Sequence, residues 1–439
     1  MKKLIVIILL MYANSLIAQT QSTTYWTDSL KNKKAEGMML NGKENGKWTF
    51  WYENGKKWSE GEYSNGEKTG LWVFWYRNGN KWIENQVVNG AYKSWYPTGE
   101  KEKVGQNKNR LMSGKWITYW KNDSIKDVSE YLNNLKNGKS ISYFDNGVKE
   151  FEGFYKDDQV DGYACWWRNT GKKEMEGKSI MGLQDSVWNF YHPNGKLGSK
   201  GPFKEGLADG KWTYYYETGE KWKQGLFEKG KRTGVWVAWY EDGVKEREGS
   251  FVDDKESGFW TSWYKNSNTK DEGYFKEGKM DGEWKGYFYG AKPKYVLHYK
   301  DNEKDGASTY WYEFGKLQSE GSYKAGLKEG KWTEYYESGK QSESGAYTNN
   351  MKSGMWQFWD KYGVKIKEQE MINGKPDGKW VEYHQNGQKS GEGTLVNRVK
   401  EGKWTYWDAG GNIVYQIEYK GGVKIREIKN ARDEIKPKK

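Results

Sequence analysis

The sequence predicts an all-β protein, an elongated single-sheet solenoid of stacked β-hairpins with about 16 repeats of about 24 residues each. Three observations predict this fold class. One short pattern recurs along almost the whole chain of 439 residues, turn residues interrupt it at fixed places, and aromatic residues make up 17% of the composition. The hydrophobic content is 35%, whereas ordinary domains have ~45–50%. Rings that each bury ~150–250 Å² would therefore replace a thick aliphatic core.

Residues 1–18 have the pattern of a secretory signal peptide. Lys2 and Lys3 precede an apolar run over residues 4–11, and the small Ala18 precedes Gln19. Such a run is too short to span a bilayer as a helix. We therefore expect residues 1–18 to be removed. The mature chain is then exported, to the periplasm or to the cell surface and medium, and has no transmembrane segment.

Residues 46–425 form the repeat array. An anchor glycine recurs from Gly46 to Gly402 at a spacing of about 24 residues, apart from one shorter interval, and Ser186 replaces it once. We number each repeat from its anchor and call all residues at one offset a column. Offset +2 is Trp in twelve of the 16 repeats, and offset +5 is aromatic in all of them. Offsets +9 and +15 are mostly Gly, +11 is commonly Lys, and +17 is often Phe or Tyr.

Each repeat is expected to be one β-hairpin, because an aromatic, β-prone run such as residues 48–52 is followed by turn residues and a second β-prone run. Two loops compete. A two-residue loop would place +8 and +9 at positive φ, which does not suit Thr218 before Gly219. A three-residue loop would use a type I turn, which favours Pro97 and Pro193 at +7, followed by Gly in the left-handed region. We favour the three-residue loop.

The favoured loop places the +5 ring opposite Lys at +11, a cation–π pair worth ~0.5–1 kcal/mol when exposed. Alternation then puts the rings at +5 and +17 on one face with the +15 glycines, and the +2 Trp on the other face. We expect the +5 column to be the spine of the solenoid. The alternative is that part of it is exposed and stacks on sugar rings or on a partner's side chains. Its tryptophans are the candidate binding or structural residues: Trp51, Trp75, Trp95, Trp167, Trp239, Trp263, Trp311, Trp359 and Trp407.

The two ends of the array depart from the pattern. Residues 19–45 are expected to form a degenerate first repeat that caps the N-terminal edge, because Gly37, Met39 and Gly42 fall at +15, +17 and +20. Residues 426–439 are a charged tail, which is expected to cover or blunt the last strand.

The repeat resembles a known family. The segment EGEYSNGEKTGLW, residues 60–72, is similar to the MORN repeat, and the preceding GKWTFWYENGKKW is similar to its bacterial variant. The resemblance covers residues 37 to 425 and is specific for the repeat but only weakly specific for function. Similar proteins act as antitoxin or immunity components of bacterial toxin modules, as scaffolds, or as membrane binders. The +15 glycine is absent at Asn85, Ser129, Leu297, Gln369 and Ile417.

Catalytic motifs are missing from the sequence. There is no P-loop, GxSxG or HExxH motif. The single Cys165 excludes disulfides and cysteine-based metal sites. His192 and His384 at +6 are interpreted as strand substitutions, and the acidic segment 157–162 as a solvated loop between repeats. We therefore expect no enzyme activity, no cofactor and no metal.

The formal net charge of +12 becomes +10 when Lys2 and Lys3 are removed, but acids and bases alternate along each repeat. That mixture, together with export, argues against nucleic acid as a partner. The preferred hypothesis is an exported, non-catalytic scaffold that binds an unknown protein partner at the cell envelope. The alternatives are an antitoxin or immunity component, and a surface module that binds envelope glycan or anionic lipid through exposed aromatic rows.

Overall fold

The computed structural model describes residues 19–26 and 31–429. Throughout these residues the chain forms strands and turns without a helix, and its 37 strands belong to one antiparallel sheet. The predicted all-β class of stacked hairpins is therefore confirmed. The proposed signal peptide, residues 1–18, lies outside the described residues, as do residues 430–439 of the charged tail.

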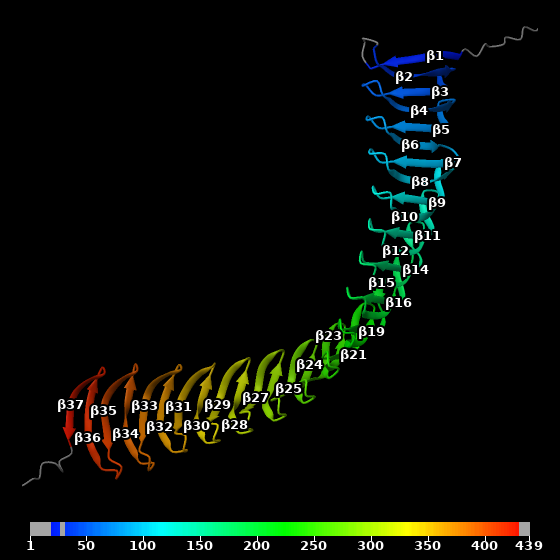
Figure 1. Ribbon diagram of the computed structural model, residues 1–439. Helices are drawn as coiled ribbons and strands as arrows, with labels where there is room; N and C mark the ends of the chain where they lie inside the picture. The colour runs from blue at the N-terminus through cyan, green and yellow to red at the C-terminus, as the bar shows by residue number, and fades with distance from the viewer. Residues whose placement is uncertain (1–18, 27–30, 430–439) are drawn as a thin grey trace, which may run out of the picture. The chain divides into compact units, whose positions relative to one another are not determined.

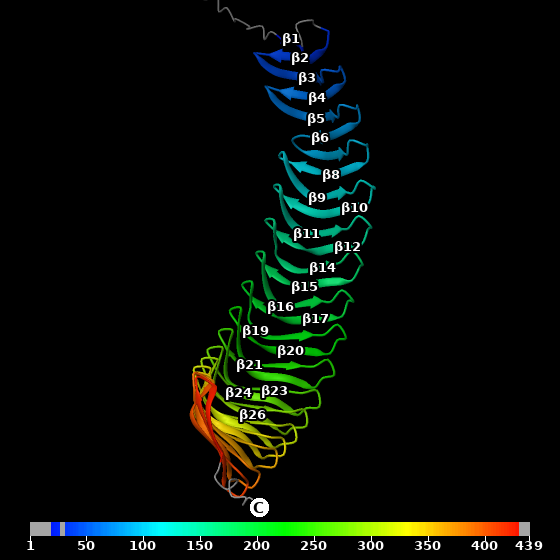
Figure 2. The ribbon, with the colours of Figure 1, turned by 90° about the vertical axis from the view of Figure 1, so that its left-hand side faces the viewer.

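The chain divides into two compact units, Met1–Ala208 and Asp209–Lys439. Within each unit the strands pair with their neighbours in chain order and form a single layer (Figures 1 and 2). Strands of the first unit are β1 (Gln19–Tyr25), β2 (Lys33–Leu40), β3 (Lys43–Trp51), β4 (Lys57–Ser64), β5 (Glu67–Trp75), β6 (Lys81–Gln86), β7 (Gly90–Trp95), β8 (Lys101–Lys108), β9 (Leu111–Tyr119), β10 (Ile125–Leu132), β11 (Leu135–Tyr143), β12 (Lys149–Lys156), β13 (Gln159–Val160), β14 (Gly162–Trp167), β15 (Lys173–Ile180), β16 (Leu183–Tyr191), β17 (Leu197–Lys204) and β18 (Leu207–Ala208).

The second unit repeats the same arrangement. Its strands are β19 (Gly210–Tyr215), β20 (Lys221–Glu228), β21 (Lys231–Trp239), β22 (Lys245–Val252), β23 (Lys255–Trp263), β24 (Thr269–Lys276), β25 (Lys279–Tyr287), β26 (Pro293–Lys300), β27 (Glu303–Trp311), β28 (Leu317–Lys324), β29 (Leu327–Tyr335), β30 (Gln341–Thr348), β31 (Met351–Trp359), β32 (Lys365–Ile372), β33 (Lys375–Tyr383), β34 (Lys389–Val396), β35 (Val399–Trp407), β36 (Ile413–Lys420) and β37 (Val423–Lys429).

The loop inside each repeat is the predicted three-residue loop. Between β3 and β4 the amide of Gly55 donates to the carbonyl of Tyr52 (2.9 Å), and the amide of Tyr52 donates to the carbonyl of Lys56 (2.8 Å). Gly55 has φ +81°, whereas Asn54 before it keeps a negative φ. This is a type I turn followed by a left-handed residue, and it explains why +9 is glycine in most repeats.

The loop between repeats is different and shorter. Asn65 and Gly66, at +19 and +20, both have positive φ (+52° and +84°) and join β4 to β5 through a two-residue turn of type I′. The next anchor, Gly70, also has positive φ (+60°) and lies in a bulge where β4 and β5 change register. The anchor glycine therefore supplies the left-handed backbone that the bulge needs.

The core is the +2 tryptophan column. Eleven of its twelve tryptophans are buried: Trp48, Trp72, Trp116, Trp188, Trp212, Trp236, Trp260, Trp284, Trp332, Trp356 and Trp404. Each such ring covers the +15 glycine of the repeat before it. A Cβ on Gly61, for example, would lie 2.3 Å from the Trp72 ring. The +17 ring packs edge-on beside it, with the Tyr63 and Trp72 centroids 5.0 Å apart.

The predicted assignment of faces was wrong for the +15 and +17 columns, although the +2 and +5 rings do lie on different faces as expected. Trp48 lies directly opposite Gly61, and Tyr63 lies opposite Gly46, so +2, +15 and +17 share one face. We call this face the tryptophan face, and the side that carries the +5 rings the opposite face. Trp51 does pair with Lys57 as expected, but the register shifts next to this pair. The extra residue at +12 forms a bulge there, and one added residue reverses which face all later residues occupy.

The missing +15 glycines follow from the same contact. Leu297 pairs with Ser308, and Ser129 pairs with Ser140, so a larger +15 residue accompanies a small residue at +2 of the next repeat. Gln369 faces Trp380, which is the one +2 tryptophan that is only half-buried. At these places a larger +15 residue therefore goes with a smaller or less buried +2 residue, whereas Asn85 lies opposite Tyr92.

Side chains also connect each repeat to both of its neighbours. The Tyr52 Oη donates to the carbonyl of Trp75 in the following repeat (2.8 Å). The Asn78 Nδ2 makes the same kind of bond forward to the carbonyl of Pro97 (2.8 Å). In the other direction, the Trp72 Nε1 donates to the carbonyl of Glu62 in the repeat before (3.0 Å). These bonds stabilise the layer where it has no second sheet to cover it.

The end segments also take part in the sheet. Within residues 19–45, β2 pairs with β3, and Gly37 lies against Trp48 as a +15 residue does elsewhere, with a notional Cβ 2.3 Å from the ring. At the other end, residues 426–429 of the proposed tail belong to β37, which pairs with β36.

Candidate interaction faces

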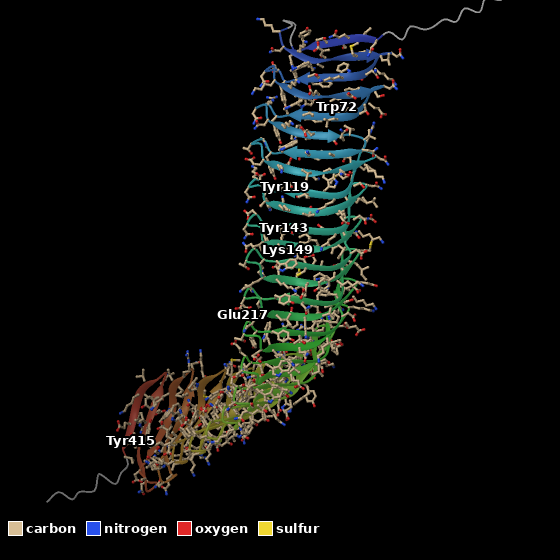
Figure 3. All side chains as sticks on the ribbon, turned by 45° about the vertical axis from the view of Figure 1, so that its right-hand side comes forward. Trp72, Tyr119, Tyr143, Lys149, Glu217 and Tyr415 are labelled. Carbon is tan, nitrogen blue, oxygen red and sulfur yellow. The ribbon has the colours of Figure 1, made fainter. Side chains whose placement is uncertain are left out.

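The predicted +5 column lies on the opposite face. All nine of its tryptophans are half-buried. They are therefore not the fully buried spine of the solenoid, which is the +2 column. They are not fully exposed stacking surfaces either. Side chains project from both sides of the layer in each unit (Figure 3).

Lysine and glutamate side chains occupy the space between successive +5 rings. Lys57 at +11 forms an ion pair with Glu60 at +14 (2.7 Å). Its ammonium lies 5.6 Å from the ring of Trp75, which is the +5 residue of the following repeat. The expected cation–π contact therefore exists, but it joins two repeats instead of closing one hairpin, because the bulge turns the +11 side chain toward the next strand.

Cys165 lies on this face within a polar cluster. Burial, with the nearby Glu176 charge, raises the pKa of the Cys165 thiol to about 11, so it is mostly protonated and unreactive at neutral pH. Burial alone would raise the pKa of Glu176, but hydrogen bonds from Lys173, Tyr191 and Tyr163 outweigh it and hold that pKa at about 2. The cluster is therefore a satisfied structural network around a permanently charged carboxylate.

The remaining polar candidates are structural as well. The His384 Nε2 lies 2.9 Å from the carbonyl of Trp407 and takes the place that Tyr Oη has at +6 in other repeats. Asp157 and Asp158 form the two-residue turn after β12, both with positive φ. Within the described residues no group of three or more His, Cys, Asp or Glu side chains has the arrangement of a metal site.

The tryptophan face carries two columns that vary from repeat to repeat. Residues at +4 and +13 lie directly opposite each other across the hairpin, beside the +2 position. The pairs are Phe50/Ser59, Phe74/Ile83, Ser94/Lys103, Thr118/Asp127, Ser142/Phe151, Trp166/Met175, Phe190/Ser199, Tyr214/Lys223, Ala238/Arg247, Ser262/Asp271, Gly286/Tyr295, Tyr310/Ser319, Glu334/Glu343, Phe358/Lys367, Glu382/Gly391 and Tyr406/Tyr415. Neither ring nor charge is constant here, unlike in the supporting columns.

Cations cover many of the buried rings on this face. The ammonium groups of Lys68, Lys328 and Lys352, each at −2, lie 4.0–4.1 Å from the +2 ring of their own repeat. Such contacts extend the lysine stems over the tryptophans and leave the charged ends at the surface. The tryptophan face therefore presents aromatic and basic groups side by side.

Three exposed tryptophans lie at the bulge position +12. Trp58, Trp82 and Trp222 are 37–41% exposed, and Trp58 packs edge-on against Phe50 with centroids 6.0 Å apart. The sequence analysis missed both these rings and the variable columns, because it placed the +2 ring and the +13 residue on different faces. The sequence feature that could have indicated these columns is the variation at +4 and +13 in repeats that otherwise follow one pattern.

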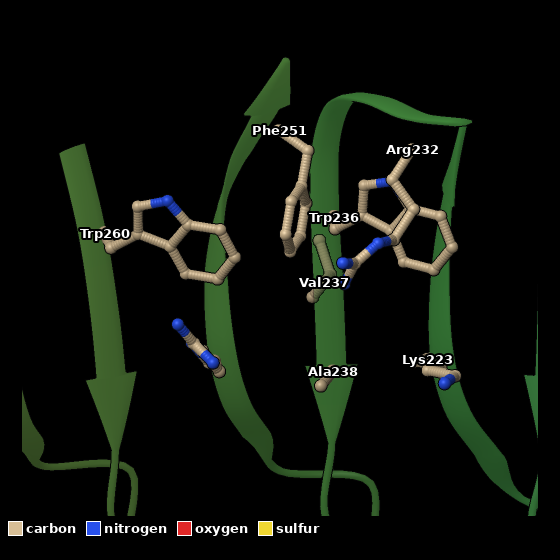
Figure 4. Close-up of a pocket in the computed structure, with 8 residues that line it drawn as sticks. Lys223, Arg232, Trp236, Val237, Ala238, Phe251 and Trp260 are labelled. Carbon is tan, nitrogen blue, oxygen red and sulfur yellow. The ribbon is translucent and has the colours of Figure 1, made fainter. Parts of the chain in front are cut away.

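One small hollow lies on the tryptophan face of the second unit. It has a volume of about 140 Å³ and is lined by Lys223, Arg232, Trp236, Val237, Ala238, Arg247, Phe251 and Trp260. Figure 4 shows the rings of Trp260, Phe251 and Trp236 in a row, with Ala238 and Lys223 to one side of that row. The hollow is therefore bordered by aromatic faces and basic groups.

In the described part of the chain no helix has the length and apolar character needed to cross a bilayer.

No curated protein matches the chain. Solved structures that match include "Crystal Structure of TcdB2-TccC3", at 9% identity and TM-score 0.15, and the Photorhabdus luminescens Tc holotoxin pore, at 8% and 0.16. The alignments cover 92% of this chain but only 27% and 30% of those chains, and likeness at such TM-scores does not establish a common fold.

The profile described as MORN repeat variant matches eight segments in both units. They are residues 44–65, 136–157, 184–205, 208–229, 304–325, 328–345, 376–397 and 400–420. Most of these segments begin two residues before an anchor position and end near the turn between repeats, so each covers one hairpin of the structure. Through these eight hairpins the chain is therefore similar to the MORN repeat variant family.

Proposed function

We propose that this protein is an exported, non-catalytic scaffold that binds another protein at the cell envelope through the tryptophan face. The observation that carries the proposal is the contrast between constant and variable columns. The +2, +9 and +15 columns keep one residue type in most repeats because the backbone and the core favour it. The +4 and +13 columns are free of that requirement and differ in almost every repeat.

Repeat proteins commonly bind partners through such surfaces, because identical scaffolding units can carry different side chains at the same position. A row of half-buried rings with basic groups beside it matches the composition of protein interfaces, which are enriched in aromatic residues and arginine. A partner that lies along this face would contact several repeats at once, and the side chains at +4 and +13 would decide which partner fits.

Export is the part of the proposal that rests on residues 1–18 alone. Lys2, Lys3 and the following apolar run favour it. Fractionation followed by intact-mass measurement tests it: the mature chain should be found outside the cytoplasm and begin at Gln19. A full-length chain that stays in the cytoplasm would contradict export without touching the binding role.

Binding is tested by capture from envelope extract with the purified mature chain, followed by identification of the retained protein and reconstitution with the purified partner. The double variant Lys223→Ser and Lys367→Ser alters the +13 column of the tryptophan face. The control Lys211→Ser and Lys331→Ser removes the same charge from exposed +1 positions of the opposite face. We expect only the first variant to weaken the complex. Equal effects of both, or no specific partner, would contradict the proposal.

A second candidate function is glycan binding, which the exposed rings of Trp58, Trp82 and Trp222 favour. Exposed aromatic rings can stack on sugar faces. Peptidoglycan or surface polysaccharide should then retain the wild-type chain, and the triple Trp→Ala variant at these positions should be retained less. Retention that does not depend on these three rings would remove this candidate.

A further inference from the structure

In the second unit the +4 position carries a ring in four of nine repeats, and the repeat that begins at Gly234 is one of the five without a ring there. At +4 the rings of Phe50, Phe74, Trp166, Phe190, Tyr214, Tyr310, Phe358 and Tyr406 cover the sheet beside the +2 tryptophans. The repeat that begins at Gly234 has Ala238 there, between the buried Trp236 and Trp260. The hollow of about 140 Å³ is the space that the missing ring leaves. Its size suits a single side chain.

Three cations border this slot, each from a different strand. Arg232 lies on β21, Arg247 on β22 and Lys223 on β20. The Arg247 guanidinium lies 4.1 Å from the Trp260 ring, and that of Arg232 lies 4.0 Å from the Phe251 ring. Stacking on the rings fixes each guanidinium plane. The Arg232 Nε and Nη2 donate to the carboxylate and the carbonyl of Asp254 (3.0 and 3.1 Å), so an anion in the slot would meet the remaining N–H groups of that guanidinium.

The acids nearby neutralise this group only in part. Arg232 pairs with Asp254 at 3.0 Å and Arg247 pairs with Glu256 at 3.4 Å. The Lys223 ammonium has no carboxylate within 4 Å in the described part of the chain, and its close neighbours are the rings of Trp222 (4.2 Å) and Tyr214 (4.7 Å). Burial, with the Arg232 charge, lowers the pKa of Lys223. A carboxylate entering the slot would compensate Lys223 and accept bonds from both guanidinium groups.

We propose that the Ala238 slot, with Lys223, Arg232 and Arg247 at its rim, is the site where an acidic segment of the protein partner inserts a glutamate or aspartate side chain. The proposal rests on the protein-binding function proposed above and gives the partner's chemistry. The next repeat, which begins at Gly258, provides a contrast that supports this proposal. There Ser262 and Asp271 occupy +4 and +13, and Asp271 accepts a hydrogen bond from Tyr295 (2.5 Å). The opening in that repeat is lined by Asp271 as well as by Arg247, so its own carboxylate offsets the arginine charge and disfavours an acidic segment there.

The test is fluorescence anisotropy of a labelled decapeptide of alternating glutamate and serine, with the glutamine–serine peptide as its neutral counterpart. Ala238→Phe fills the slot with a ring that this chain already tolerates opposite a cation, because Phe358 faces Lys367 with the ammonium 4.4 Å from the ring. Ser262→Phe makes the same change in the neighbouring repeat and is the matched control. Both variants should keep the wild-type circular dichroism spectrum.

We expect the acidic peptide to bind the wild-type chain, and affinity to fall about tenfold or more in Ala238→Phe and in Lys223→Gln, the loss expected for a charge-assisted bond. Ser262→Phe should bind as the wild type does. The proposal is overturned if the glutamine peptide binds equally well, if no acidic peptide binds, or if Ala238→Phe has no effect. Slot-dependent binding to phosphatidylserine vesicles instead of the peptide would also overturn it.

Failure of this site is distinguishable from failure of the scaffold function. If Ala238→Phe still captures the envelope partner as the wild type does, the slot is not the acidic site, and the scaffold proposal stands. If the wild-type chain captures no partner, the scaffold proposal fails whatever the peptide does.

Discussion

A glycine at +15 is a contact surface for a ring, because the tryptophan of the next repeat lies flat against its Cα. Gly249 shows the tightest case, with a notional Cβ only 2.0 Å from the Trp260 ring. The indole has no room to retreat, since it is 4% exposed and packs edge-on against Phe251 with centroids 5.1 Å apart. Side-chain volume at this one position therefore controls the core.

Gly249→Ala is expected to destabilise the protein by about 1–3 kcal/mol, the usual cost of overpacking a core. The measurement is the shift of the denaturant midpoint, followed by tryptophan fluorescence. Gly290→Ala is the control, because a Cβ there meets nothing within 4 Å and its φ is not positive. A control that loses as much as Gly249→Ala would show that glycine flexibility, not the ring contact, is responsible.

Glu176 should make the folded protein sensitive to acid. Its pKa is about 2 in the fold against an ordinary value of 4.5. Between these two pH values the Glu176 carboxyl is protonated in the unfolded chain but charged in the folded protein. The charged carboxylate therefore stabilises the fold fully above pH 4.5. This stabilisation is lost as the pH falls toward 2. In Glu176→Gln the melting temperature should fall less steeply over this interval than in the wild type.

Glu228→Gln is the control for that pH dependence, because Glu228 is an exposed strand-end carboxyl. It should keep the wild-type slope. Identical slopes for all three proteins would mean that the bonds from Lys173, Tyr191 and Tyr163 do not hold the carboxylate charged.

In the hairpin loop, the residue types at +7 and +8 determine how stable the turn is. The loop after β21 has the same two backbone bonds as the others, from Gly243 to Tyr240 and from Tyr240 to Val244. In the loop of Tyr96 the next residue, at +7, is already Pro97, which shows that the backbone there accepts proline after tyrosine. The position +8 differs, since the Asp242 carboxylate accepts a bond from the Val244 amide (3.1 Å).

Glu241→Pro is therefore expected to stabilise the protein by about 0.4–1 kcal/mol, because proline restricts the unfolded chain without disturbing the turn. Asp242→Pro, one residue later, should destabilise it, since proline is disfavoured at this place in a type I turn and the carboxylate bond is lost. Thermal melting of both variants checks the prediction. Stabilisation by both would contradict the type I assignment.

The same loop shows which features of the fold could be predicted from the sequence and which could not. Pro97 and Pro193 at +7, and threonine at +8, carried enough information to choose the three-residue loop and the pairing of +5 with +11. They did not reveal the bulge at +12, because that position holds residues as different as Trp58, Glu102 and Gly198. Since one hidden residue reverses the faces, the +5 rings were expected to form the spine that the +2 rings form.

Over the whole molecule, the composition is explained by a single layer. Most repeats bury one indole against one glycine and leave most other side chains half-exposed, so a hydrophobic content of 35% is sufficient. Stability then arises mainly between neighbouring repeats. The candidate interaction face could have been read from the sequence only through its variability, because no single residue there has a recognisable motif.

Two deletions of equal length test this neighbour dependence. Removing residues 330–353 brings the Gly321 repeat beside Trp356, which recreates the usual glycine–tryptophan contact. Removing residues 306–329 instead brings Leu297 against Trp332, whereas in the native chain it faces Ser308. Both deletions take out one whole repeat and join the remaining repeats in register.

We expect the first deletion to keep the thermal transition close to that of the full chain, and the second to lower it or to produce an early separate transition, because leucine and tryptophan together would overpack the contact. Differential scanning calorimetry, with circular dichroism to compare strand content, makes the comparison. Similar melting of the two shortened chains would show that the contact between +15 and +2 does not govern stability.

The forward bonds of Tyr and Asn and the backward bonds of Trp have an evolutionary consequence. Because many hairpins offer their neighbours similar donors and acceptors on both sides, a gene segment that encodes one hairpin can be duplicated or lost by recombination with little new chemistry to invent. Lineages can thus tune the reach of this protein by copy number, and afterwards diversify the spare copies one surface side chain at a time.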